Sequence, residues 1–140
     1  MQIKIEIYGE PAPQGSKKIV QGRMIEASKK LKPWRKAIAL AVENALPEDH
    51  VKIMSACLVQ VDFYLPRPPS VKRNKRERPI VPPDCDKLVR GVLDGLGQGL
   101  NGVSGDGRLW HDDAIAVDII ARKFYDDDRL IGATVVITVL

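Results

Sequence analysis

The sequence has few cysteines and no long apolar run, and these absences exclude several classes of protein. Its two cysteines, Cys57 and Cys85, lack the spacing of a metal site, a redox motif or a disulfide framework. Cys57 lies in an apolar run and is interpreted as a small core residue. No apolar stretch reaches the roughly 18 residues that a membrane span requires, and the first residues lack a signal-peptide pattern. The sequence therefore predicts a cytoplasmic protein.

Internal repeats and long flexible linkers are also absent from the sequence. A chain of 140 residues has the size of one domain, and such a domain buries roughly two-thirds of its unfolded surface. The apolar share of 44% and the charged share of 29% are typical of a globular protein. We therefore expect one domain over residues 1–140 with a single hydrophobic core.

Positive and negative charges are divided unequally along the chain. The net charge of +4 combines a balance of +8 over residues 1–80 with a balance of −4 over residues 81–140, where all ten acidic residues are aspartates. Lysine and arginine hold phosphates, and carboxylates hold divalent metal ions. The division indicates an enzyme that acts on nucleic acid, although aspartates also serve in turns and helix caps.

Hydrophobic periodicity and turn residues predict the secondary structure. In chain order we expect a strand over 3–8, a hairpin over 17–26, a helix over 28–46, a strand over 55–65, a helix over 84–96, and strands over 114–125 and 131–140. Ser28 is the expected N-cap of the first helix, and Pro47 ends it. Asp126, Asp127 and Asp128 are expected to form a solvated hairpin turn. The order predicts an α+β fold, a mixed β-sheet with two main helices packed on one face and the 55–65 strand at its centre.

Aspartates gather at two places in the second half of the chain. Asp84 and Asp86 begin the second predicted helix, where Asp84 is the expected N-cap. Asp112 and Asp113 directly precede the strand 114–125. Because the helix and this strand are adjacent in the sequence, we expect Asp84, Asp86 and one of Asp112 or Asp113 to converge. The structural alternative is that Asp84 and Asp86 only cap the helix and offset its dipole.

Carboxylates that gather in this way are suited to a divalent cation. Mg²⁺ takes oxygen ligands and is held by a few carboxylates together with water and substrate phosphate. Such an ion polarises a scissile phosphate and supplies a water of lowered pKa. Arg90 and Lys87, on the same helix, are the candidates to neutralise charge on the phosphate in the transition state. The spacing of Asp86, Arg90 and Asp94 leaves open that Arg90 is a structural bridge between the two aspartates.

Two basic segments are candidate DNA-binding surfaces. The first is the proline-rich loop 66–83, which leads directly to the acidic cluster, and the second spans residues 17–36. Contacts to phosphate carry little base information, so we expect shape-directed binding that weakens with salt. A solvated charged face is the alternative for the loop. The residues expected to contact DNA are Lys17, Lys18, Arg23, Arg67, Lys72, Arg73, Lys75, Arg76 and Arg78.

Three further features receive other interpretations. The string G-x-G-x-x-G at 97–102 follows a helix instead of a strand, which argues against a dinucleotide site. His111 is interpreted as a partly buried or solvated residue, with a metal or base role as the alternative. Trp110 is expected to anchor the neighbouring strand in the core.

The acidic pattern resembles the RusA family of Holliday junction resolvases, which are found in bacteria and their phages. The pattern is Asp-x-Asp-x-Leu-x-cation-x-x-x-Asp over residues 84–94, followed by Trp-x-Asp-Asp over 110–113. The segment P-A-P-Q-G-S-K at 11–17 resembles the proline-rich opening that follows the first strand in that family. The likeness spans most of the chain and is most specific over residues 83–113.

The resemblance implies a Mg²⁺-dependent crossover junction endodeoxyribonuclease. Such an enzyme resolves four-way DNA junctions as a homodimer by paired symmetric nicks. The likeness implies that Asp84, Asp86 and Asp113 bind the metal, that Asp112 is the acidic residue beside the third ligand, and that Arg90 stands at the family's functional lysine.

Departures from the family pattern leave alternatives open. Arg90 is less able than a lysine to give up a proton, and Lys87 stands where the family commonly has asparagine. The loop 97–107 also looks longer than usual. One alternative is a non-catalytic DNA-binding protein with a structural acidic cluster, and another is a nuclease for other branched DNA.

Overall fold

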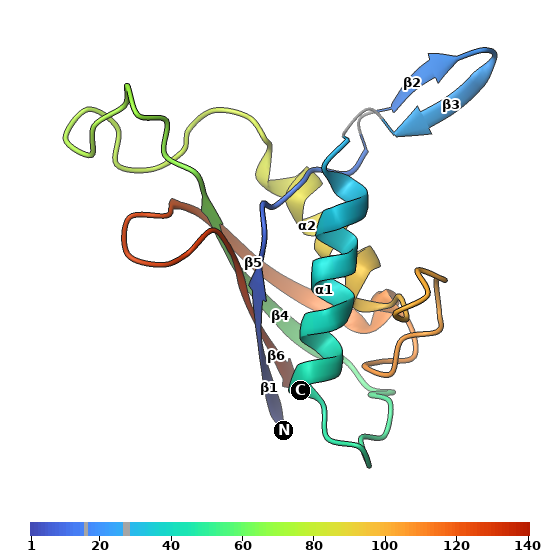
Figure 1. Cartoon of the computed structure of the whole chain (residues 1–140). Coiled ribbons are helices and arrows are strands. Elements are labelled where there is room, and N and C mark those ends of the chain that lie inside the picture. Colours follow the sequence, from blue (N-terminus) through green and yellow to red (C-terminus); the bar gives the residue numbers. More distant parts are fainter. Residues whose placement is uncertain (16, 27–28) are drawn as a thin grey trace.

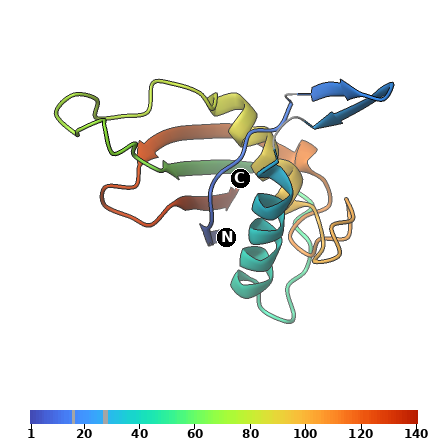
Figure 2. The same ribbon diagram turned by 45° about the horizontal axis from the view of Figure 1, so that its top comes forward.

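A computed structural model describes residues 1–15, 17–26 and 29–140. In chain order its elements (Figure 1) are β1 (Gln2–Tyr8), β2 (Lys17–Val20), β3 (Arg23–Glu26), α1 (Leu31–Ala45), β4 (Cys57–Leu65), α2 (Cys85–Leu96), the short 3-10 helix η1 (Asp113–Ile115), β5 (Ala116–Tyr125) and β6 (Gly132–Val139). The expected hairpin is confirmed, and it projects from the body of the molecule (Figure 2). Ser28 lies outside the described residues, and its prediction as the N-cap of the first helix is wrong, because α1 begins at Leu31 with Lys30 in the N-cap position. None of the described helices is long and apolar enough to cross a membrane.

Four strands form one mixed sheet in the order β1-β6-β4-β5. β6 pairs antiparallel with β1 and with β4, whereas β4 and β5 run parallel. β4 therefore has a neighbour on each side, and its residues alternate between buried and half-buried along the whole strand. The predicted α+β class and the central position of the 55–65 strand are confirmed.

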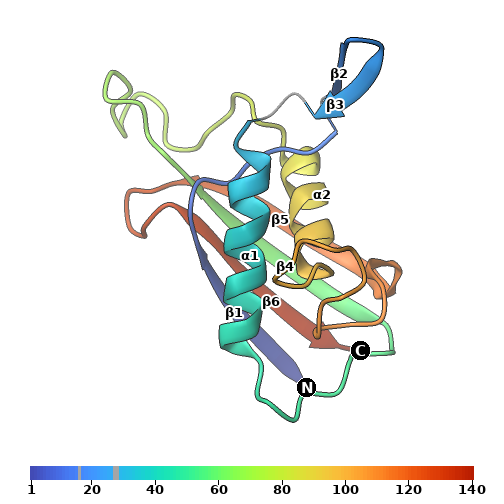
Figure 3. The same ribbon diagram turned by 45° about the vertical axis from the view of Figure 1, so that its right-hand side comes forward.

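Both helices cover the same face of the sheet (Figure 3). One contiguous core joins them to it, and the fully buried helix residues of that core include Trp34, Ile38, Val42, Leu88, Val92 and Leu96. Burial of each such side chain stabilises the fold by about 1.5–3 kcal/mol. The two helices approach closely at Gly95, where a Cβ atom would lie 2.8 Å from Cδ1 of Ile38. Any larger residue at this crossing would force the Ile38 side chain to shift.

Two smaller predictions about the core are also confirmed. Cys57 is fully buried at the start of β4, as an apolar core residue would be. Trp110 is 3% exposed and pairs with Ile53 in an isolated parallel bridge. This bridge ties the segment before η1 to the chain that enters β4, which is the anchoring role expected for the tryptophan.

The predicted hairpin turn between the last two strands is wrong. β5 and β6 lie on opposite sides of β4 and do not pair with each other. The connecting segment instead crosses the end of β4, where the amide of Asp126 donates a hydrogen bond of 2.9 Å to the carbonyl of Leu65. The chain does turn here, but β5 pairs with one side of β4 and β6 pairs with the other. The turn therefore does not close a hairpin.

The aspartates of this connection bind the basic loop instead of facing only solvent. Asp127 accepts two hydrogen bonds of 2.7 Å from the guanidinium of Arg67, and Asp126 accepts one of 2.9 Å from the Arg67 amide. The Arg67 guanidinium also lies 4.2 Å from the ring centroid of Tyr125 and donates to the carbonyl of Arg76. Arg67 therefore fixes the start of the 66–83 loop to the end of β5.

The Asp127–Arg67 pair makes the stability of the fold depend on pH. The hydrogen bonds from Arg67 hold the pKa of the Asp127 carboxyl below its usual range. Such a carboxyl stabilises the fold above its unfolded pKa, and this contribution is lost as the pH falls through the folded pKa. We therefore expect Asp127→Asn to lower the Tm at neutral pH, with the difference from wild type shrinking in acid.

The measurement is thermal unfolding followed by circular dichroism from neutral pH into the acid range. Asp128→Asn is the matched control. The Asp128 side chain is 78% exposed, and its ion pair to Arg73, at 3.4 Å, lies at the surface. Little change is expected for this control. A Tm difference for Asp127→Asn that stays constant with pH would contradict the assigned role of the pair.

Candidate active site

The helix α2 has two chemically different faces. Leu88, Val92 and Leu96 are fully buried against the sheet. Asp86 and Arg90 are exposed and Asp94 is half-buried on the outward side of the same helix. The spacing of four residues between these three charged positions places them along one stripe. The predicted polar stripe is therefore present, and packing of the apolar face holds it outward.

Asp84 occupies the N-cap position of α2, as predicted, but its side chain makes no capping hydrogen bond. Its carboxylate is 57% exposed and lies 4.0 Å from Nζ of Lys87. Asp86 follows in the first turn, where a negative charge is favourable to the helix dipole. A purely capping role therefore does not account for the Asp84 carboxylate, which is accessible to a ligand.

Arg90 does not bridge the two aspartates of its stripe. Within the described ranges, neither Asp86 nor Asp94 forms an ion pair with it. The guanidinium instead lies against Gly15, where a Cβ atom would come within 2.8 Å of Nη1, and Gly15 has a φ of +111° that favours glycine. The structural alternative for Arg90 is therefore wrong, and its guanidinium has no anionic partner in the described part of the chain.

Asp94 is instead held by two residues from other elements. Nε2 of Gln14 donates to Oδ2 of Asp94, while Oε1 of Gln14 accepts from Nη2 of Arg35 on α1. Nη2 of Arg35 also lies 3.4 Å from Oδ2 of Asp94. The backbone amide of Gln14 donates a 3.0 Å hydrogen bond to the backbone carbonyl of Lys87. This bond fixes the loop after β1 on α2. Sequence reasoning did not identify this network, because the three side chains come from distant segments.

Asp112 and Asp113 lie directly before β5 and differ in their surroundings. Asp112 caps η1, and the hydrogen bond of 2.9 Å that Oδ1 accepts from the Ala114 amide lowers the pKa of its carboxyl. Partial burial raises the pKa of Asp113, and the neighbouring carboxylates of Asp112 and Asp94 raise it further. The three aspartates line one hollow of about 300 Å³, and Gly105 and the exposed His111 also line it.

The aspartates predicted to converge line three different hollows. Asp84 faces residues 121–123 of β5, Asp86 lies beside Arg90 and Leu93, and Asp113 lies beside Leu93 and Asp94. Leu93 lines both the hollow of Asp86 and that of Asp113, so the two hollows adjoin at this residue. Across the described residues, no group of three or more histidine, cysteine, aspartate or glutamate side chains is placed to hold a metal ion.

The direction of α2 explains why Asp84 and Asp113 lie apart. Nζ of Lys123, near the end of β5, donates to the carbonyls of Val81 and Pro83, which precede α2. The end of α2 lies beside the beginning of β5, because Gly97 and Asp113 share one hollow. Helix and strand therefore run in opposite directions, so the strand entry meets Asp94 instead of the helix N-terminus.

The cations of the 66–83 loop differ in how far the fold already uses them. Arg67 is bound by Asp127, and Nε of Arg76 donates to the hydroxyl of Tyr125. Arg78 lies 4.3 Å over the ring of Phe124. A further three loop cations are exposed: Lys72, Arg73 and Lys75. Arg73 pairs with Asp128 at 3.4 Å, so Lys72 and Lys75 are the more accessible to an anionic ligand, whereas Arg67 has a structural role.

The hairpin cations are part of the same prediction. Lys17 and Lys18 lie on β2, and Arg23 lies on β3. The structure describes the backbone of this projecting ribbon, and contacts by these three side chains lie outside what it describes. Their role in DNA binding stays a prediction.

The sequence model described as Endodeoxyribonuclease RusA matches residues 8–138, which is nearly the whole chain. The chain belongs to the RusA family of endodeoxyribonucleases. The resemblance found in the acidic pattern is therefore confirmed. No curated protein matches the chain at a significant level. Membership in RusA makes hydrolysis of phosphodiester bonds in DNA the chemistry of this fold, which agrees with acidic hollows beside exposed cations.

The glycine-rich segment of this RusA chain is a structured loop between two hollows. Gly97 is the C-cap of α2, and its carbonyl accepts hydrogen bonds from the amides of Gly105 and Gly107. Asn101 further closes the loop by accepting from the Val103 amide and donating to Asp106. The G-x-G-x-x-G string follows a helix, as interpreted from the sequence, so the arrangement of a dinucleotide site is not formed.

The Gln14–Arg35–Asp94 network predicts an energetic coupling between α1 and α2 in this RusA protein. We expect a double-mutant cycle of Arg35→Ala and Asp94→Ala to give a coupling of about 0.5–1 kcal/mol, the upper part of the range for surface ion pairs. The coupling should weaken in high salt because the pair is partly screened. Chemical denaturation of the four proteins of the cycle measures it.

The exposed pair Lys30–Glu10 is the matched control for this cycle. Its charged atoms approach to 2.8 Å, but the two side chains are 64% and 42% exposed, against 26% and 37% for Arg35 and Asp94. A smaller coupling is expected for the control. Equal couplings in the two cycles would contradict the stronger coupling assigned to the partly buried Arg35–Asp94 contact.

Proposed function

We propose that this RusA-family chain is a Mg²⁺-dependent, structure-specific endonuclease that resolves four-way DNA junctions. The match to the RusA family over residues 8–138 carries this proposal. The outward acidic stripe of α2 supports it, since Asp86 and Arg90 are exposed beside the hollow of Asp112 and Asp113. Carboxylates and a cation on adjoining surfaces are what hydrolysis of a phosphodiester requires.

The donor chemistry of the site fits Mg²⁺. The candidate ligands are the carboxylates of Asp84, Asp86, Asp112 and Asp113, and Mg²⁺ is usually bound by one or two carboxylates, waters and substrate phosphate. A preformed group of three side chains is therefore not required for the fit. The ion would polarise the scissile phosphate and supply a water of lowered pKa.

The protein's own cations have a separate task at the phosphate. Arg90 is always charged and presents a planar fork of donors that suits phosphate oxygens. Its guanidinium is exposed, and Lys87 lies one turn away on the same helix. We infer that Arg90 stabilises negative charge on the phosphate, with Lys87 in support. A guanidinium does not act as a general acid, so protonation of the leaving oxygen falls to water.

Recognition of the junction would rest on phosphate contacts. Exposed Lys72, Arg73 and Lys75 lie in the loop that leads into α2, and we expect a strand held by this loop to pass toward α2. Phosphate contacts position DNA without reading its sequence. A homodimer with twofold symmetry would present two equivalent sites to a four-way junction, and paired symmetric nicks would follow from that symmetry.

Substitution of Asp86 tests the catalytic assignment. We expect Asp86→Asn to abolish cutting of a synthetic four-way junction, because a neutral amide is a weak Mg²⁺ ligand, while binding in a gel shift is retained. The matched control is Asp49→Asn, which removes an exposed carboxylate in the segment after α1. This control should cut as wild type does. Retained cleavage by Asp86→Asn would remove Asp86 from the catalytic residues.

A comparison of substrates tests the reaction itself. We expect a labelled four-way junction to be cut in the presence of Mg²⁺ and to be bound but uncut in EDTA, with flap and duplex DNA cut much more slowly. Binding without cleavage at any metal concentration would favour a non-catalytic DNA-binding protein. Faster cleavage of flaps than of junctions would favour a nuclease for other branched DNA.

A further inference from the structure

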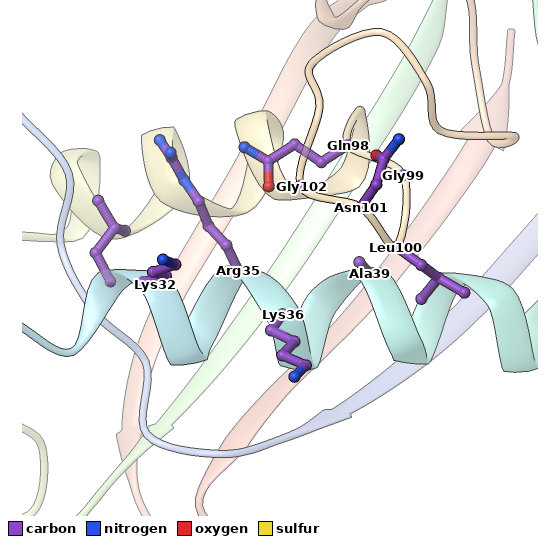
Figure 4. A pocket seen from close by; sticks show the side chains of 10 residues that line it. Lys32, Arg35, Lys36, Ala39, Gln98, Gly99, Leu100, Asn101 and Gly102 are labelled. Atoms are coloured by element: carbon purple, nitrogen blue, oxygen red, sulfur yellow. The ribbon is translucent and has the colours of Figure 1, made fainter.

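We name the hollow lined by Asp94, Asp112 and Asp113 the acidic hollow. A second hollow lies on the other side of the glycine-rich loop. It has a volume of about 540 Å³ and lies between α1 and residues 98–102. Figure 4 shows its lining, with Arg35 extended from α1 toward α2. This volume lies within the range of ordinary ligand sites, which is roughly 300–1,000 Å³. We name it the basic hollow, after the cations of α1 that line it: Lys32, Arg35 and Lys36.

Lys32 and Lys36 carry uncompensated charge at the basic hollow. Both are exposed, they are spaced four residues apart on α1, and within the described residues neither forms an ion pair. Like charges at this spacing repel each other. Lys32 also lies in the first turn, which has no acidic residue, and there a cation opposes the helix dipole. Local helix stability therefore disfavours both lysines, and an anion bound between them would offset the repulsion.

Arg35 has a different role from the two lysines. Its guanidinium is engaged by Gln14 and Asp94, and its Nε atom is buried without a hydrogen-bond partner among the described residues. Arg35 therefore forms the wall between the basic hollow and the acidic hollow, since Asp94 lines the latter. The two hollows adjoin each other through this ion pair.

The remaining lining of the basic hollow suits a nucleotide more than a bare ion. Leu31, Ala39 and Leu100 give it an apolar wall. The side-chain amide of Gln98 makes no hydrogen bond within the described residues, whereas that of Asn101 donates to Asp106 and accepts from Val103 inside its own loop. Cations, an apolar wall and one free amide together match a phosphate with its attached sugar and base.

We propose that the basic hollow seats the backbone of a DNA strand beside the reaction site, with two successive phosphates on Lys32 and Lys36 and a nucleotide against Leu100 and Gln98. Lys36 extends from the side of α1 that faces away from residues 98–102 (Figure 4), so the strand crosses α1 instead of ending in the hollow. This inference rests on the proposed function, because it takes the acidic hollow as the place of cleavage. The strand then runs from the acidic hollow past the Arg35–Asp94 wall. Of the three α1 cations, only Lys32 and Lys36 contact DNA.

The test measures binding of a synthetic four-way junction in EDTA, so that it does not depend on cleavage. Each phosphate contact contributes a slope of about 0.9 to the fall of log affinity with log salt. The double variant Lys32→Ala/Lys36→Ala should therefore lower the salt slope by about 2 and weaken binding by roughly 60-fold near 0.1 M salt. Its Tm should equal or exceed that of wild type, because the substitutions remove repulsion and alanine favours the helix.

Lys4→Ala is the matched control for loss of charge. Lys4 is an exposed cation on β1, paired with Glu6 at 3.5 Å and separated in sequence from α1. Each single lysine variant of α1 is compared with it. Arginine at both positions should keep the salt slope of wild type, since a guanidinium also binds phosphate. Inorganic phosphate is added alone to distinguish a small-anion site from a strand-binding site.

The outcomes separate this inference from the proposed function. A selective loss of salt slope in the Lys32 and Lys36 variants supports the basic hollow as a strand seat. Losses no larger than that of Lys4→Ala would overturn it, even if wild type binds and cuts junctions. It would also be overturned if phosphate alone saturated the site while the variants bound junction normally. If the wild-type protein neither binds nor cuts a junction, the proposed function is contradicted, and this inference, which rests on it, falls with it.

Discussion

Packing of the apolar face of α2 onto the sheet is the constraint on which the site depends. Leu88, Val92 and Leu96 are fully buried, and a helix cannot rotate about its axis without exposing such residues. Their burial fixes Asp86 and Arg90 on the outward face. The close approach of α1 at Gly95 fixes the helix along its length. The acidic stripe is thus a consequence of how the core is filled.

Local sequence signals were sufficient for most of the fold. Alternation in β1, the apolar run of β4, the helical periodicity of α1 and α2, and the turn residues of the 17–26 hairpin each predicted an element that is present. These signals act within one element, where period and turn chemistry decide the conformation. The outward stripe on α2 was predictable for the same reason, because it depends only on spacing along one helix.

Features that depend on tertiary arrangement could not be predicted in this way. β5 pairs with β4 and not with β6, and this choice depends on contacts between strands that are distant in the sequence. The antiparallel course of α2 and β5 brings Asp94 to Asp113 and leaves Asp84 near Lys123. Gln14 carries no local sign of its contact with Asp94. The site is therefore a set of adjoining hollows along α2, whereas sequence proximity suggested one point of convergence.

The central claim is that the outward face of α2 and the start of β5 act on one metal-bound phosphodiester. The most direct test replaces Mg²⁺ with paramagnetic Mn²⁺ in the presence of a four-way junction that cannot be cut. The broadening of backbone amide NMR signals by Mn²⁺ is then measured. The account predicts the strongest broadening at Asp86, Asp112 and Asp113. Broadening confined to the Asp126–Asp128 connection, or none at α2, would contradict it.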